Sequence, residues 1–209
     1  MSPGFHAMTP ASVHCFPPGA AIQNPQPGDF MLTHGVEWTD RLIRFGQRLR
    51  FRGADAPYAH WNHSALFVDA EGGIVEALAG GVARRNISLY ASTEYTVVSI
   101  QASLEDRQQA VTFAEKCVGD PYGWLTIVSI AWTLLTGGHF SFAIDGQQIC
   151  SGLVARAEER TWAIFDRDPA HIMPADLARY YQVAAPPPGT PIGTPPPPAG
   201  RLPRFVRPT

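Results

Sequence analysis

A cysteine stands directly before a helical pattern in the stretch QQICSGLVARAEE, residues 147–159. A thiol reacts as its thiolate, and the unpaired N–H groups at a helix N-terminus favour that negative charge. Leu153 and Val154 would bury one side of the helix and turn Cys150 toward whatever lies before the helix end. Cys150 is therefore a candidate nucleophile. Free cysteines are also among the most buried residue types, so a purely structural cysteine is the alternative.

A nucleophilic thiol needs a base, which must come from elsewhere in the chain. Among seven histidines, His63 has the strongest claim because it opens HSALFVDA, an alternating run that predicts a rigid β-strand. His60, in the preceding turn-like YAHWN, is its competitor. The two histidines together lack a third ligand at a recognisable metal-binding spacing, so we expect neither a metal nor another cofactor.

The third member of such a site orients the imidazole through its second nitrogen. Glu76 lies within the otherwise apolar run GGIVEALAG, where a charged residue is anomalous unless it is paired. A hairpin with its turn at residues 71–73 would bring Glu76 and His63 onto one face of a sheet. The alternative is an edge strand on which Glu76 faces solvent.

Short apolar runs separated by turn residues predict a small antiparallel sheet that would position these side chains. The runs are GDFMLTHG, HSALFVDA, GIVEALAG and YTVVSIQ. Helices are expected at residues 124–135, after Cys150, and at MPADLARYY, where Pro174 suits the first helical position. A sheet followed by helices of this kind belongs to the α+β class.

A further helix is predicted in SLEDRQQAVTFAEKCVG, with Ser103 as the N-cap, Asp106 three residues later and Gly119 as the stop. The apolar side chains expected on its buried side are Leu104, Val111, Ala114 and Val118.

The segment DRLIRFGQRLRFR, residues 40–52, predicts an amphipathic and strongly basic helix. Its expected apolar side carries Leu42, Phe45 and Leu49, and its basic side carries Arg41, Arg44, Arg48 and Arg52. The basic side is either a solvated surface or an electrostatic rim that attracts an acidic polymer or a lipid headgroup.

The ends of the chain differ in composition from its middle. Residues 1–24 are rich in Pro, Gly, Ala and Ser without periodicity and predict a flexible leader. Residues 184–209 are dense in proline and predict an extended, disordered tail. One folded domain is therefore expected over residues 25–183, within the usual domain size.

Charge and composition limit the class of protein. The formal net charge of the 209 residues is -2, so no global field favours nucleic acid. Three cysteines fit neither a disulfide scaffold nor a zinc motif. The first residues lack a secretory signal, which makes a cytoplasmic location the default, with export by other routes open. The uncharged stretch 121–144 contains Gly137 and Gly138 and predicts a buried core helix rather than a membrane span, with peripheral membrane contact as the alternative.

Five motifs occur in the order typical of one family. In this order the chain resembles the circularly permuted NlpC-type papain-like proteins, specifically the YiiX/YaeF-like amidase group. The resemblance runs from Pro27 to Tyr181 and rests on GDFML, YAHWNHSALFV, GIVEAL, KCVGDPYG and ICSGLV. Histidine precedes cysteine here, as permutation implies. One departure is Gly152, where the family commonly has an acidic residue.

The resemblance implies a permuted papain-like fold in which Cys150 is the nucleophile, His63 the general base and Glu76 the residue that orients it. The expected reaction is hydrolysis of an amide of peptide or cell-wall peptide type, with the oxyanion held by the Cys150 N–H and by Gln147 or Gln148. Two alternatives stay open: a lipid-directed thiol acyltransferase or hydrolase of the lecithin:retinol acyltransferase type, and a binding module without turnover. The sequence leaves the oligomeric state undetermined.

Overall fold

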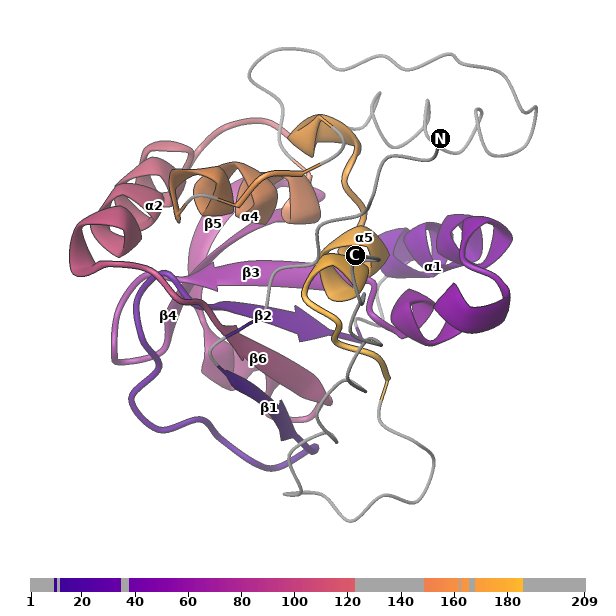
Figure 1. Cartoon of the computed structure of the whole chain (residues 1–209). Helices are drawn as coiled ribbons and strands as arrows, with labels where there is room; N and C mark the ends of the chain where they lie inside the picture. The colour runs from indigo at the N-terminus through magenta and orange to yellow at the C-terminus, as the bar shows by residue number, and fades with distance from the viewer. Residues whose placement is uncertain are drawn as a thin grey trace, which may run out of the picture.

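A six-stranded antiparallel sheet with helices packed against it forms the fold, which is α+β as the sequence predicts. The computed structural model describes residues 10, 12–34, 38–122, 149–161, 163–165 and 168–185, with residues 38–42 described by backbone alone. The strands run in the spatial order β1-β6-β2-β3-β4-β5 (Figure 1). They are β1 (Ser12–Phe16), β2 (Phe30–Thr33), β3 (His63–Phe67), β4 (Gly73–Leu78), β5 (Gly81–Asn86) and β6 (Tyr95–Ser99).

The helices lie over one face of the sheet and beyond its end. They are α1 (Trp38–Arg50), α2 (Leu104–Lys116), α4 (Cys150–Glu158) and α5 (Pro174–Tyr180), with short 3-10 turns η1 (Gly53–His60), η2 (Ile87–Tyr90), η3 (Glu159–Thr161) and η4 (Pro169–His171). Helices α2 and α4 lie side by side, and α4 packs on β3 and β4 (Figure 1).

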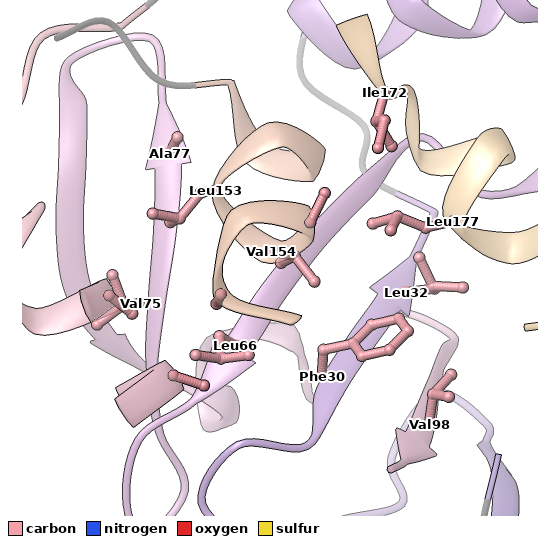
Figure 2. Close-up of a cluster of buried hydrophobic side chains, with 14 of the residues drawn as sticks. Phe30, Leu32, Leu66, Val75, Ala77, Val98, Leu153, Val154, Ile172 and Leu177 are labelled. Atoms are coloured by element: carbon pink, nitrogen blue, oxygen red, sulfur yellow. The ribbon is translucent and has the colours of Figure 1, made fainter. Parts of the chain in front are cut away.

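The larger core fills the space between α4 and the sheet. Leu153 and Val154 of α4 are fully buried there, and Figure 2 shows them facing side chains of the central strands. The strand residues in this core include Phe30, Leu32, Leu66, Val75, Ala77 and Val98. The opposite face of the sheet carries a second cluster that includes Met31, Ala65, Phe67, Ile74, Tyr95 and Val97. Alternate residues of one strand thus enter different cores, as a strand buried on both faces requires.

The predicted flexible leader contains a strand and was wrong in that part. Strand β1 pairs with β6, from Ser12 opposite Ser99 to Phe16 opposite Tyr95. The ring of Phe16 stacks on Tyr95 with centroids 4.9 Å apart. Proline and glycine dominate the composition around this short run and conceal it, but the ladder needs only five residues.

The sequence analysis did not predict strand β5, because its residues do not form an apolar run. Its first residues, Gly81 and Val82, are buried, but Arg84 and Arg85 near its end are not. An edge strand needs apolar side chains only where it meets the core, and charged residues protect its free edge from pairing with other chains.

Helix α2 begins at its predicted N-cap, and the predicted stop, Gly119, lies in the turn that follows its last residue, Lys116. Ser103 Oγ accepts a hydrogen bond from the Asp106 N–H at 3.1 Å, and Gly119 has a φ of 97°, a left-handed conformation that favours glycine. The predicted buried side was partly wrong, since Leu104 is 86% exposed and Val118 is 42% exposed. Leu104 is the first residue of the helix, and Val118 lies in the turn beyond its last residue, Lys116, so the core covers neither side chain.

The prediction that Phe45 lies on a buried apolar side of α1 was wrong. Phe45 is 55% exposed, and among the described side chains of this helix, residues 43–50, Gln47 is the buried one. The Gln47 amide donates to the Trp61 carbonyl at 2.7 Å and accepts from the Ala175 N–H at 2.9 Å. A polar side chain can occupy this position because both ends of its amide have partners.

The helix expected at residues 124–135 and most of the proline-rich tail, from residue 186, lie outside the described residues. Within the part of the chain that the structure describes, no helix has both the length and the apolar character needed to cross a membrane.

Candidate active site

Cys150 is the first residue of α4, and its side chain is 2% exposed. Ile149 occupies the cap position, and its side chain makes no capping hydrogen bond. The first N–H groups of the helix therefore remain available to a negative charge at this end. The buried Leu153 and Val154 fix the direction of the helix and thereby the position of the sulfur.

The two residues after Cys150 hold the first turn of α4 against the segment before α5. Ser151 Oγ donates to the Ile172 carbonyl at 2.5 Å. A Cβ atom on Gly152 would lie 2.8 Å from the Pro169 carbonyl oxygen, closer than real contacts allow. Gly152, the departure from the resembled family, is thus the residue that permits this close packing.

His63 begins β3 and pairs with Thr33 of β2. Its Nε2 lies 2.6 Å from Glu76 Oε2, and the side chain also makes a hydrogen bond with Cys150. One imidazole therefore links the sulfur to the carboxylate.

The hairpin of β3 and β4 brings His63 and Glu76 together. Leu66 pairs with Val75, and Phe67 pairs with Ile74. His63 and Glu76 lie beyond the last of these pairs on their strands, where the 2.6 Å contact between Nε2 and Oε2 joins them.

In the turn of this hairpin, the backbone lies close to neighbouring side chains. The Asp69 carboxylate accepts the Gly73 N–H at 2.6 Å. Gly72 has a φ of 87°, and a Cβ there would meet Ile87 Cγ2 at 2.8 Å. The turn therefore needs glycine at residue 72 for both conformation and space.

Glu76 is fully buried on β4, which lies between β3 and β5. The alternative of a solvent-facing glutamate on an edge strand is therefore wrong. The Tyr90 hydroxyl donates to Glu76 Oε2 at 2.5 Å, and Arg85 Nε lies 3.6 Å from Oε1. Burial alone would raise the pKa of Glu76, but the hydrogen bonds from His63 and Tyr90 and the charges of His63 and Arg85 lower it. The carboxylate is thus held in its ionised form.

Opposing effects act on the imidazole of His63. Burial alone would lower its pKa, but the hydrogen bonds and negative charges of Cys150 and Glu76 raise the pKa well above its usual value. The ring therefore keeps its proton to a higher pH than a free imidazole does.

His60, the competing base, belongs to a different cluster. Its ring stacks on His34 with centroids 4.8 Å apart, and its Nε2 lies 3.4 Å from Glu94 Oε2. Burial is the main cause that lowers the pKa of His60. Within the described ranges, no three His, Cys, Asp or Glu side chains are arranged to hold a metal ion.

The remaining cysteines are free and lie away from this site. Cys15 on β1 accepts a hydrogen bond from Thr96 Oγ1 at 3.2 Å, and burial raises its pKa. Burial and the neighbouring Asp120 raise the pKa of Cys117 to about 11. Both thiols are consequently poor nucleophiles at neutral pH.

Sequence reasoning missed Tyr90 and Arg85, which contact Glu76 from η2 and β5. A buried carboxylate requires such partners, but nothing in the sequence says which residues supply them. The predicted oxyanion donors Gln147 and Gln148 lie outside the described residues. Comparison of the chain with protein-family models and with curated proteins finds no match.

Proposed function

We propose that this chain is a thiol-dependent hydrolase that cleaves an amide bond of peptide or cell-wall peptide type through Cys150, His63 and Glu76. The observation that carries the proposal is the imidazole of His63, which contacts Cys150 and lies 2.6 Å from Glu76. His63 and Glu76 lie on the adjacent strands β3 and β4, and Cys150 comes from α4, far along the chain from both. A nucleophile, a base and an orienting carboxylate in one contact chain are what acyl transfer needs.

The finer fold assignment is part of this proposal. A helix that starts at the cysteine and packs on an antiparallel sheet, with the histidine on one strand and the acidic residue on the next, is what the resemblance to permuted NlpC-type proteins implies. Strand β3 precedes α4 in the chain, so the histidine comes first, as in the permuted arrangement. We therefore propose a permuted papain-like fold.

The first half of the reaction transfers the acyl group to sulfur. Before the attack, the proton of the Cys150 thiol has passed to His63, and the thiolate then attacks the carbonyl carbon to form a C–S bond. The negative oxygen that results is held by the uncapped N–H of Cys150 at the start of α4. The imidazolium then donates its proton to the leaving nitrogen, the C–N bond breaks, and the amine departs.

The second half releases the acyl group to water. His63 takes a proton from a water molecule, the water oxygen attacks the thioester carbonyl, and the C–S bond breaks. The carboxylic acid leaves and the thiolate is restored with the imidazolium beside it. Throughout, Glu76 keeps the ring oriented and balances its positive charge.

Alkylation by iodoacetamide tests the nucleophile. We expect one fast-reacting cysteine, lost in Cys150→Ala and slowed in His63→Ala. Cys15→Ala and Cys117→Ala are matched controls that should retain the fast reaction, because burial raises the pKa of both thiols. Hydrolysis of cell-wall peptides, followed by mass spectrometry, tests the substrate class. Equal and slow alkylation of all cysteines would favour a binding module without turnover.

A lipid-directed thiol hydrolase or acyltransferase is the second candidate, because α1 presents an apolar side chain among basic ones. Phe45 is 55% exposed, and Arg48, one turn later, is also exposed. Gln47 ties this helix to the Trp61 carbonyl, two residues before His63. Apolar and cationic side chains together suit an anionic membrane surface.

Co-sedimentation with vesicles distinguishes the two candidates. A lipid-directed enzyme should pellet with phosphatidylglycerol vesicles at low salt, and Phe45→Ser with Arg48→Glu should abolish pelleting. Leu104→Ser is the control, because Leu104 is an exposed apolar residue on another helix. Failure to pellet would remove this candidate and leave the amidase proposal.

A further inference from the structure

The carboxylate of Glu76 has two oxygens in different surroundings. Oε2 accepts hydrogen bonds from both His63 Nε2, at 2.6 Å, and the Tyr90 hydroxyl, at 2.5 Å. Oε1 faces Arg85 Nε at 3.6 Å and makes no hydrogen bond with the described residues. Two donors therefore share one oxygen, whereas the other oxygen accepts no hydrogen bond from the described residues.

Tyr90 also contacts the imidazole directly. Its ring and that of His63 are nearly parallel, with an interplanar angle of 19° and centroids 5.9 Å apart. One side chain thus borders the base with its ring and contacts the orienting carboxylate with its hydroxyl. This combination restricts both partners of the His63–Glu76 pair.

The backbone that carries Tyr90 is itself fixed. Residue 90 ends η2, whose N-cap Asn86 accepts the Ser88 N–H at 3.0 Å. Ile87, at the start of the same turn, is buried and packs against Gly72 of the β3–β4 turn, where a Cβ atom would lie 2.8 Å from Ile87 Cγ2. The turn that holds Tyr90 is thereby attached to the hairpin that holds His63 and Glu76.

We infer that Tyr90 is a positioning residue of the proposed active site, which sets the orientation of Glu76 and limits how strongly Glu76 attracts the proton of His63. This inference rests on the proposed function for its effect on turnover, but its effect on His63 is independent of turnover. A donor on Oε2 withdraws electron density from the oxygen that His63 uses. Removal of that donor makes the oxygen a stronger acceptor and leaves the carboxylate less restrained.

The charged and titratable groups that face the pair come from each surrounding element. Cys150 lies on α4, Glu76 on β4, Arg85 on β5 and Tyr90 on η2. Of these, Tyr90 is the one whose hydrogen bond can be removed by a single hydroxyl deletion that changes no formal charge. Tyr90→Phe keeps the ring beside His63 and is therefore the informative variant.

Proton NMR titration of His63 tests the inference without turnover. In a Cys150→Ser background, which removes the thiol in both proteins compared, Tyr90→Phe should move the His63 pKa upward. Site-specific 3-fluorotyrosine at residue 90, a stronger donor, should move the His63 pKa downward. Shifts of opposite sign are expected only if the hydroxyl acts through Glu76, because damage to packing has no reason to change sign. Unchanged titration in both proteins would overturn the inference.

Kinetics in the Cys150 protein give the second measurement. Tyr90→Phe should lower kcat/KM about 10- to 100-fold, the usual effect of one lost hydrogen bond to a charged group. The alkaline limb of the pH–rate profile should move to higher pH, in step with His63. A fall in rate with an unmoved profile would mean a structural role only.

Tyr95→Phe is the matched control. The Tyr95 hydroxyl accepts the Ile22 N–H at 3.0 Å, so its loss removes a tyrosine hydrogen bond outside the site. This variant should lose stability without moving the His63 titration. Absence of any hydrolysis in the parent chain would refute the proposed function, whereas the titration would still decide the role of Tyr90.

Discussion

Glu158, at the end of α4, makes the stability of this protein depend on pH in a specific way. The side chain is fully buried. Oε2 accepts hydrogen bonds from Thr161 at 3.1 Å and from the Tyr181 hydroxyl at 3.3 Å, but Oε1 has no partner among the described residues. Burial is the main cause that raises its pKa from 4.5 to about 8. Glu158 is therefore protonated in the folded protein at neutral pH.

The direction of the effect follows from proton binding. Below about pH 4.5, Glu158 holds its proton in both the folded and the unfolded chain and has no effect on stability. Between pH 4.5 and about 8, the unfolded chain has lost this proton but the folded protein keeps it. The free energy of unfolding then falls by about 1.4 kcal/mol for each pH unit, to a total of at most about 5 kcal/mol.

Glu158→Gln keeps the shape of the side chain and removes the titration. Urea denaturation of both proteins at several pH values from 4.5 to 8.5 measures the difference. The variant should gain stability relative to the parent as the pH rises, and the gain should level off above pH 8. Glu105→Gln, a change at an exposed glutamate of α2, should give a curve parallel to that of the parent. A parallel curve for Glu158→Gln would refute the reasoning.

Three further changes test the site and its supports. Glu76→Gln should lower the pKa of His63, because the carboxylate charge is lost, and should reduce kcat/KM about 100-fold or more; NMR titration and steady-state rates measure both. Gly152→Ala should lower the free energy of unfolding by about 1–3 kcal/mol, because its Cβ would lie 2.8 Å from the Pro169 carbonyl oxygen. The control, Ala155→Gly in the same helix, should lower it by only about 1 kcal/mol. Thermal unfolding of the two variants measures both losses. Gln47→Leu should cost about 2–4 kcal/mol, because the Trp61 carbonyl and the Ala175 N–H both lose a buried partner; urea denaturation shows this, and an unchanged midpoint would mean that water replaces the amide.

The parts of the site that the sequence predicts are those with local signals. His63 opens an alternating run, Glu76 interrupts an apolar one, and a short glycine turn joins the two strands. Period and turn chemistry together set the hairpin and its register. The signal for the start of α4 is also local, since the apolar side chains that follow Cys150 predict the helix.

The parts that the sequence does not predict depend on distant partners. Gln47 is polar and reads as exposed, but its two hydrogen bonds come from residues 61 and 175. Strand β1 gains its stability from β6, whose partner residues lie far along the chain. Tyr90 carries no periodic signal at all. In each case tertiary contacts decide the outcome, and a single sequence gives no information about which contacts form.

The proposed catalytic groups belong to two separately built units. The imidazole and the carboxylate lie on adjacent strands of one hairpin and need no other element to meet. The sulfur comes from a helix that is held by side-chain packing and by the contacts of Ser151 and Gly152. A small shift of that helix along the sheet would break the contact between the sulfur and the ring and leave the hairpin pair intact. The proposed activity therefore depends on how firmly α4 is held.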